Sequence, residues 1–392
     1  MPWYGYGVLF FIVLRMVCSV GLTQAATINA ASCSITDIQA AHTSASNGDT
    51  IQLPTCTQTT WTSTVTITKA VTIKGNGTAN TILQRSAVAS DYESNVMFRV
   101  QGVTSGTTIF QDFTLNGTQD TNEGAWLDMG IWLDNGGEFR IHHMQFTYLG
   151  IAIQVHGNPT VQKGVIDHNT FTNIYTQACN CNPNFGADSY GYAVSVVGSG
   201  TYGSLVLGTD QNVFIEDNTF THPKSAVSSN NGARYVFRYN TVTDASDHGP
   251  SVDAHGHVAS WPVGSRSWEI YNNTLNVPAG WWTGIEPTGG DGVIFNNAID
   301  GDYQREIVLG DGDCSGSYPL AYQIRAAYIW NNTFTGGGDI TSITNECPSF
   351  VQLNRDYFLS AMPGYTPYTY PHPLVSGGSG VPAATTVLRI IQ

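Results

Sequence analysis

The chain has 392 residues, of which 42 are glycine, 41% are hydrophobic and only 11% are charged, less than half the charged share of an average soluble domain. This composition argues against a coiled coil, a helix bundle and a charged disordered chain. The formal net charge of -14, with only four lysines, argues against nucleic acid as a partner, because phosphate binding needs clustered Lys and Arg.

The first 25 residues have the features of a secretion signal. Residues 8–22 form an apolar run interrupted only by Arg15, and Ala25 ends a short segment of the kind that a signal peptidase cleaves. A membrane span needs about 20 unbroken apolar residues, which this run does not provide. We therefore expect a secreted or cell-surface protein that has no membrane contact once residues 1–25 are removed.

Six cysteines remain after the signal, an even number that indicates disulfides in an exported protein. The candidates are Cys33, Cys56, Cys179, Cys181, Cys314 and Cys347. Proximity in the sequence favours the pairs Cys33–Cys56 and Cys314–Cys347, which leaves the remaining two to bond each other or stay reduced. Zinc binding is the alternative, but neither C-x-x-C nor H-x-x-x-H spacing supports it.

A short pattern recurs along the chain and places asparagine at the same position of each copy. The complete copies have Asn169, Asn218, Asn240, Asn273, Asn297 and Asn332 at that position, and two earlier copies have Phe113 and Met144 there. The shortest spacings, 22 to 25 residues, match one turn of a parallel β-helix. The longer spacings fit turns that carry loop insertions.

Each copy has the features of a short strand, a tight bend and a second short strand, with apolar side chains at alternate positions. An asparagine at every bend can stack on its copy one turn away, so that the side-chain amides bond one another and the backbone without any charge. The pattern therefore predicts a parallel β-helix over residues 26–359 with a ladder of asparagines inside it.

The start of this region predicts a cap for the coil. Residues 34–45 begin with Ser34 and have Ile38, Ala41 and Ala45 at helical spacing, which is typical of a capped amphipathic helix. Such a helix would cover the open end of the first turn, where unpaired strand edges invite aggregation.

Strand segments follow this helix at residues 48–54 and 65–73. Together with the helix they resemble the opening of the right-handed parallel β-helix, or pectin-lyase-like, superfamily, and the resemblance extends over about residues 31–359. It implies an all-β solenoid of right-handed coil. Residues 360–392 depart from the repeat: residues 365–373 predict a stiff extended tail, and residues 376–380 have the composition of a flexible linker.

The densest group of titratable residues lies in one of the loop insertions, where a β-helix is expected to carry its functional residues. It comprises His248, Asp253, His255 and His257, with Arg266 after it. If this stretch is a strand, Asp253 and His255 point to the same side, as do His255 and His257. Three roles fit the set: metal binding, acid–base catalysis, and hydrogen bonding that only orders a loop.

Neighbouring segments add further candidates. Lys224 is the only lysine in the later half of the repeat, and Glu286 and Asp291 lie one turn beyond the histidine-rich insertion. Trp281 and Trp282 precede them and are candidates for stacking on sugar rings. The simpler interpretations are a solubilising charge for the lysine and a packed loop for the tryptophans.

The order of these segments is similar to that of β-helix polysaccharide lyases of the alginate and chondroitin type. That resemblance implies that Lys224 takes the proton next to a uronate carboxyl group, that an arginine assists the leaving oxygen, and that Ca²⁺ neutralises the carboxylate. The two arginine positions of that family correspond here to residues 253–255 and to Glu286.

We therefore expect a secreted, polysaccharide-active β-helix protein, with β-elimination on a uronate-containing glycan as the preferred mechanism. Glycoside hydrolysis is the second hypothesis, because carboxylates on neighbouring turns, such as Asp253 with Glu286 or Asp291, have the spacing that glycosidases need. A non-catalytic surface filament or glycan-binding protein that assembles with its own copies is the third.

Overall fold

The computed structural model describes residues 1–2, 25–86, 96–118, 128–134, 137–157, 163–174, 191–243, 249–256, 263–310, 314, 322–336 and 343–376. The predicted signal peptide, except for its ends, lies outside these residues. So do Cys179, Cys181, His248 and His257.

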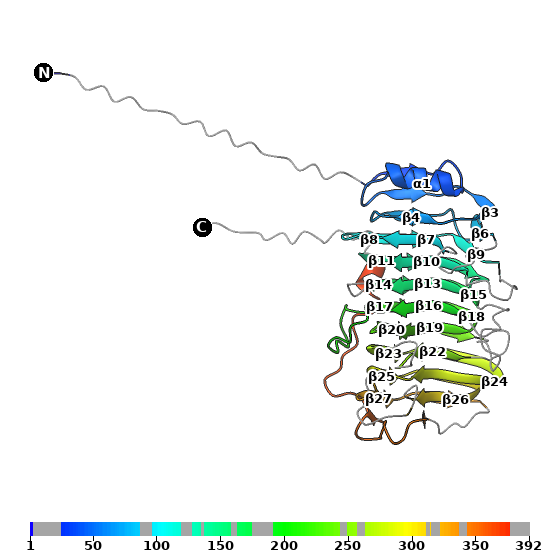
Figure 1. The fold of residues 1–392 in the computed structure, drawn as a ribbon, viewed down its shortest axis with the longest axis vertical. Helices are drawn as coiled ribbons and strands as arrows, with labels where there is room; N and C mark the ends of the chain where they lie inside the picture. The colour runs from blue at the N-terminus through cyan, green and yellow to red at the C-terminus, as the bar shows by residue number, and fades with distance from the viewer. Residues whose placement is uncertain are drawn as a thin grey trace.

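The chain winds into a tall stack of turns that build three ladders of parallel strands (Figure 1). The fold is the right-handed parallel β-helix that the sequence predicts. The first ladder is a 12-stranded sheet. Its strands are β1 (Thr27–Asn29), β2 (Thr50–Gln52), β5 (Thr72–Lys74), β8 (Thr107–Gln111), β11 (Glu138–His142), β14 (Gly164–Asp167), β17 (Val213–Glu216), β20 (Arg234–Arg238), β23 (Ser267–Tyr271), β25 (Asp291–Phe295), β27 (Ala327–Trp330) and β30 (Tyr357–Phe358).

The second ladder follows the bend after each strand of the first ladder. Its strands are β3 (Cys56–Trp61), β6 (Thr81–Arg85), β9 (Thr114–Asn116), β12 (Gln145–Thr147), β15 (Thr170–Ile174), β18 (Thr219–Pro223), β21 (Thr241–Thr243), β24 (Thr274–Pro287), β26 (Ala298–Leu309) and β28 (Thr333–Thr335). All of its pairings are parallel, as in the first ladder.

The third ladder closes each turn and carries the candidate site. It contains β4 (Val65–Ile67), β7 (Val96–Gln101), β10 (Met129–Asp134), β13 (Ile151–His156), β16 (Tyr192–Val197), β19 (Ser225–Asn230), β22 (Pro250–Ala254) and β29 (Ile343–Asn345). The long strands β24 and β26 belong to the second ladder in their first halves and to the third in their last halves. They join the two ladders into one 18-stranded sheet.

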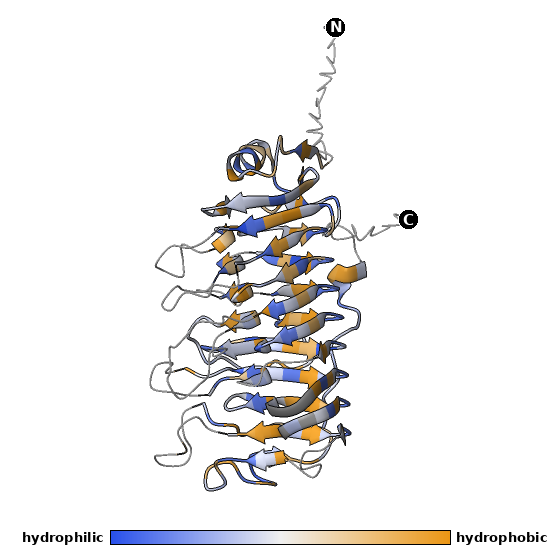
Figure 2. Ribbon diagram, turned by 90° about the vertical axis from the view of Figure 1, so that its right-hand side faces the viewer, coloured by the Kyte–Doolittle hydropathy of each residue, from blue (hydrophilic) through white to orange (hydrophobic). Residues whose placement is uncertain are grey.

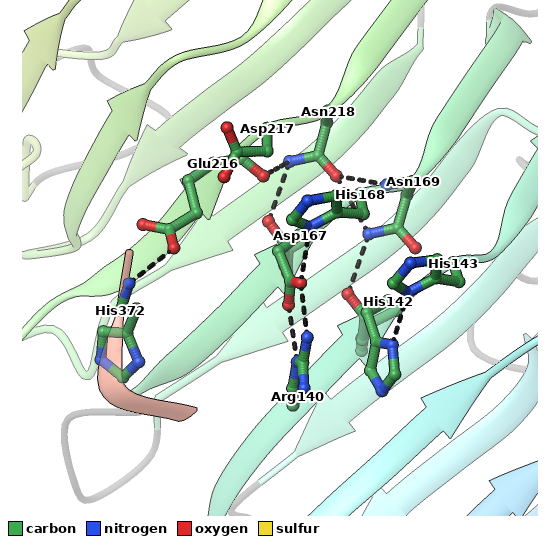
Figure 3. A network of polar contacts seen from close by, with 12 residues as sticks. Arg140, His142, His143, Asp167, His168, Asn169, Glu216, Asp217, Asn218 and His372 are labelled. Atoms are coloured by element: carbon green, nitrogen blue, oxygen red, sulfur yellow. Dashed lines mark hydrogen bonds and ion pairs between the residues drawn. The ribbon is translucent and has the colours of Figure 1, made fainter. Parts of the chain in front are cut away.

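The predicted asparagine ladder is confirmed. From Asn169 to Asn297, the side-chain amide nitrogen of each asparagine donates to the amide oxygen of the next one, at 2.9–3.2 Å. The backbone N–H of each donates to the same oxygen. Figure 3 shows the bond between Asn169 and Asn218. These buried amides are therefore satisfied without charge, which explains how the fold manages with few ionisable residues.

The bend before each asparagine has a left-handed backbone. His168, Asp217 and Tyr239, for example, have φ values of 54°, 56° and 55°. Aspartate, asparagine and histidine tolerate this conformation better than most residues. Two residues after the asparagine, Phe171 and Phe220 stack inside the coil with their ring centroids 4.7 Å apart. The repeat thus combines a bend, a polar ladder and an apolar stack.

Strands carry both hydrophobic and hydrophilic residues, and buried positions alternate with partly exposed ones in several of them, including β6, β8 and β11 (Figure 2). The helix α1 (Ile35–Ser44) lies at the N-terminal end of the stack (Figure 1). Ser34 caps it by accepting a hydrogen bond from the backbone N–H of Asp37, and Ile38 and Ala41 are buried in the core.

Two of the predicted disulfides are confirmed, Cys33–Cys56 and Cys314–Cys347. No helix among the described residues is long and apolar enough to span a membrane.

Residues 360–376, here called the strap, run back from the last turn along the outer side of the first ladder and end in the short helix α2 (Pro373–Ser376) beside β14 (Figure 1). Tyr365 and Tyr368 pack there against an apolar cluster that includes Val236 and Phe295. The extended tail predicted from the sequence is therefore packed on the sheet over this length.

Candidate functional site

The site lies on the outer side of the third ladder, where consecutive turns place polar residues above one another. Val227 of β19 pairs with Val252 of β22, and both side chains belong to the apolar core. The residues that follow them, Ser228 and Asp253, therefore point outward. Asp253 pairs in turn with Glu286 of β24. Three consecutive turns thus contribute one polar column.

Asp253 is the most tightly held member of this column. Ser228 Oγ donates a hydrogen bond to Asp253 Oδ2 at 2.7 Å, and His255 Nε2 lies 3.0 Å from the same oxygen. The side chain is buried. Because both contacts use Oδ2, the other carboxylate oxygen, Oδ1, is not engaged by either neighbour.

His255 follows two residues after Asp253, at the end of β22. The negative charge of Asp253 raises the pKa of His255 above its ordinary value, against the opposing effect of burial. The predicted juxtaposition of these two side chains is therefore present.

Glu286 has the opposite environment. Its Oε2 is buried and has no well-aligned hydrogen bond from the described residues, although the nearby Thr283 hydroxyl acts to lower its pKa. Burial, followed by the negative charge of Asp253, raises the pKa of Glu286 to about 7. The raised pKa favours the protonated carboxyl near neutral pH, which is the form that a general acid requires.

Lys224 lies between β18 and β19, and its ammonium group is 5.3 Å from the centre of the Tyr192 ring. Burial lowers the pKa of Lys224, while the charges of Asp253 and Glu286 act in the other direction. A Cβ at Gly249 would lie only 2.8 Å from Lys224 Cε, so glycine at that position makes room for the lysine. The structure thus brings Lys224 to the same carboxylate pair.

Arg266 and Asp291 are placed differently. They form an ion pair with each other, 3.0 Å between Nη1 and Oδ2, at the corner of the coil where β23 and β25 begin. No described contact joins either of them to Asp253 or Glu286. For Trp281 and Trp282 only the backbone is described: both lie in β24, where Trp281 pairs with Tyr303.

Ser228 and Tyr192 are the site residues that the sequence reasoning missed. The signal for Ser228 was available, because it lies 25 residues before Asp253, which is one turn of the repeat. Tyr192 follows the longest loop insertion between two asparagines of the repeat, so the spacing of the repeat did not predict that it lies beside Lys224.

Calcium binding at this site stays a prediction: Ca²⁺ takes six to eight oxygen ligands, and Asp253 and Glu286 are the carboxylates that the polar column offers. No group of three or more His, Cys, Asp or Glu side chains in the described part of the chain is arranged to hold a metal.

The chain matches no protein-family model and no curated protein. Among solved structures it is similar to an alginate lyase from Paenibacillus sp. str. FPU-7, with 15% identity over 80% of this chain and 99% of that one and a TM-score of 0.40. It is similar to a mannuronic acid-specific polysaccharide family 6 lyase from human gut microbiota, with 13% identity, 90% and 93% coverage and a TM-score of 0.43. A GH87 α-1,3-glucanase from Streptomyces thermodiastaticus strain HF3-3 gives 13% identity, 81% and 70% coverage and a TM-score of 0.41. What the chain shares with these proteins is the fold, and its chemistry has to be argued from its own side chains.

Proposed function

We propose that this protein is an extracellular glycoside hydrolase that cleaves a polysaccharide with Asp253 and Glu286. The observation that carries the proposal is the contrast between these two stacked carboxyl groups. One is held by a hydroxyl and an imidazole, and the other is buried and has a pKa of about 7. When the environments of two carboxyl groups differ in this way, one group acts as the acid and the other as the base or nucleophile. Here Glu286 is the acid and Asp253 is the nucleophile.

The spacing supports a retaining mechanism. Asp253 and Glu286 are register partners on adjacent parallel strands, which lie about 4.8 Å apart. Retaining glycosidases place their carboxyl groups about 5–5.5 Å apart, and inverting ones about 6.5–9.5 Å apart. In the proposed first step, Asp253 Oδ1 bonds the anomeric carbon while the leaving oxygen takes the proton of Glu286. In the second step, Glu286 takes a proton from water as that water displaces Asp253.

The surroundings agree with a polysaccharide as substrate. The strands that carry the column, β19, β22 and β24, belong to a long stack of parallel strands (Figure 1), along which an extended chain can lie. The two disulfides suit an oxidising, extracellular compartment, in line with the predicted signal peptide.

Lys224 supports β-elimination as a second candidate. Burial lowers its pKa, which favours the neutral amine that a base requires, and it lies beside the same pair. In that reaction Lys224 takes the proton next to a uronate carboxyl group, the C–O bond breaks as a C=C bond forms, and the leaving oxygen takes a proton from Glu286.

The test is to incubate the purified protein with a panel of neutral and uronate polysaccharides and measure new reducing ends and ultraviolet absorbance in parallel. Hydrolysis gives reducing ends without the absorbance of an unsaturated sugar. It should be abolished by Glu286→Gln and Asp253→Asn, and unaffected by the matched control Glu138→Gln on the first ladder.

The retaining assignment is checked by NMR, which should show the product released first with the anomeric configuration of the substrate. Unsaturated product that depends on Lys224 would replace hydrolysis by β-elimination. A lack of product from every polymer, or full activity in Glu286→Gln, would overturn the proposed role of the pair.

A further inference from the structure

A second cluster of charged residues lies at the corner of the coil where the strands of the first ladder begin. Arg234 opens β20, Arg266 directly precedes β23, Asp291 opens β25, and Arg325 lies two residues before β27. The register places these starts above one another, because Arg234 pairs with Ser267 and Ser267 pairs with Asp291. Four consecutive turns therefore bring three guanidinium groups and one carboxylate to one corner.

Asp291 is the acidic member of this corner. Its Oδ2 accepts a hydrogen bond from Arg266, and its Oδ1 accepts the backbone N–H groups of Arg325 and Ala326, at 2.9 Å and 2.8 Å. The four residues therefore carry three positive charges and one negative charge, and the carboxylate already accepts three hydrogen bonds. This local excess stands out in a chain with a formal net charge of -14.

The loop segment that starts at Tyr202 lies against the arginines. Arg234 Nη2 donates to the carbonyl of Ser204 at 3.0 Å, and Arg266 Nε donates to the carbonyl of Gly203. The guanidinium carbon of Arg266 lies 4.7 Å from the centre of the Tyr202 ring. The same ring is in T-shaped contact with Tyr322, with the ring centroids 4.7 Å apart.

Two donors of this corner are buried and have no hydrogen-bond acceptor among the described residues, although Arg266 lies close enough to the Tyr202 oxygen to act on its pKa. The hydroxyl of Tyr202 and the Nε of Arg234 reach no acceptor there. Arg325 has an exposed side chain, and no described bond engages its guanidinium. Leaving buried donors unpaired costs free energy, and a bound acceptor would recover it.

We infer that this corner is an anion-binding site, built by Arg234, Arg266, Arg325 and the Tyr202 hydroxyl, for a carboxylate or sulfate group. Arginine is suited to this because its planar fork of N–H groups matches the oxygens of such anions. The group can come from a free anion or from an acidic substituent of a glycan. The site is separate from Asp253 and Glu286 and does not depend on cleavage.

Calorimetric titration of the full chain with sodium sulfate, at constant ionic strength set with sodium chloride, tests the inference. The wild type should bind sulfate. Arg325→Gln should weaken binding by about tenfold, as expected for losing one charged hydrogen bond. Tyr202→Phe should weaken it less. Lys74→Gln removes one positive charge from β5, several turns away, and should leave the affinity unchanged.

The source of the anion is decided by competition. A uronate oligomer that displaces sulfate from the wild type, while its carboxyl-reduced counterpart does not, assigns the site to an acidic glycan. Sulfate binding without such competition assigns it to a free anion. An absence of sulfate binding, or an equal loss in Arg325→Gln and Lys74→Gln, overturns the inference, since water alone would then satisfy the buried donors. Melting curves of each variant, recorded without sulfate, show that the losses do not come from unfolding.

Discussion

Two outer surfaces of the coil bury ionisable side chains, and they do so in different ways. Under the strap, Arg238 and Glu216 are completely buried, with Arg238 Nε 2.7 Å from Glu216 Oε2. The remaining N–H groups of Arg238 donate to the carbonyls of Tyr368 and Thr369 and to the hydroxyl of Tyr271. The backbone N–H of His372 donates to Glu216 (Figure 3). All the polar groups of this pair have partners.

On the third ladder one buried polar group lacks such a partner. Glu286 Oε2 is buried and has no well-aligned hydrogen bond from the described residues, and its pKa is raised to about 7. Buried polar groups in native proteins are almost always bonded, so an exception calls for an explanation. The difference teaches that burial of charge alone does not mark a site in this fold. What distinguishes Glu286 is the combination of a raised pKa, a buried Oε2 without a well-aligned hydrogen bond, and a second carboxyl group beside it in the ladder.

The largest expected effect separates activity from stability at the two surfaces. Glu286→Gln should lower kcat by about 10²–10⁴-fold, the usual contribution of a general acid, while the protein stays folded. Glu216→Gln, the matched change under the strap, should lower the melting temperature and leave kcat of the folded enzyme unchanged. Turnover and thermal unfolding measured on both variants check this. The comparison fails if Glu216→Gln loses as much turnover as Glu286→Gln.

The next effect concerns the strap. Arg238→Ala removes one partner of a buried ion pair and the donors that hold Tyr368 and Thr369. We expect a loss of about 3–5 kcal/mol in the free energy of unfolding, as is typical when one member of a buried pair is deleted. Denaturant titration measures it, and a loss below about 1 kcal/mol would contradict the role of the strap as a structural clamp. Arg99→Gln, at a partly exposed pair, is the control and should cost about 1 kcal/mol or less.

The sequence predicted what is local and periodic. The asparagine ladder follows from one residue repeated once per turn, so that even the partner of Asn218, which is Asn240, could be named. The strap could not be placed in this way. Its bond between Tyr365 and Glu269 spans 96 residues, and that between Tyr370 and Asp217 spans 153, and neither pair belongs to a repeat.

The candidate site was predicted in part for the same reason. Asp253 and Glu286 are both in strands, and the repeat fixes them as neighbours. Arg266 follows the same insertion but lies beyond a corner of the coil, where the chain changes ladder, and it pairs with Asp291 instead. Whether a residue after an insertion lies before or after a corner of the coil depends on the conformation of that insertion. The spacing of the repeat does not predict that conformation.

The proposed role of Glu286 as the acid predicts how activity depends on pH. Glu286 can donate a proton only while it is protonated, so kcat/KM should fall by about tenfold for each pH unit above a pKa of about 7. A rate profile from acid to alkaline pH measures this. A kcat/KM that rises through neutrality would exclude Glu286 as the acid.

The same raised pKa predicts how stability changes with pH. The ordinary pKa of this carboxyl is 4.5, and the folded protein raises it, so the folded state binds the proton more tightly than the unfolded chain does. This contribution to stability is complete below the ordinary value and is lost as the pH rises through about 7. Because Glu286→Gln cannot ionise, its melting temperature should exceed that of the wild type at alkaline pH and match it at acid pH.

The smallest effect is expected at Ser228, whose hydroxyl holds Asp253 together with His255. Ser228→Ala removes one hydrogen bond to a charged group and leaves the imidazole contact, so kcat should fall by about three- to tenfold, or about 1 kcal/mol. Ser195→Ala, one turn earlier in the same column, is the matched control, since Ser195 pairs with Ser228 in the ladder and no described bond joins it to Asp253. Equal turnover in the two variants would mean that His255 alone orients the carboxylate. The catalytic site would then consist of Asp253 and Glu286 with His255, and the serines of the polar column would have a structural role only.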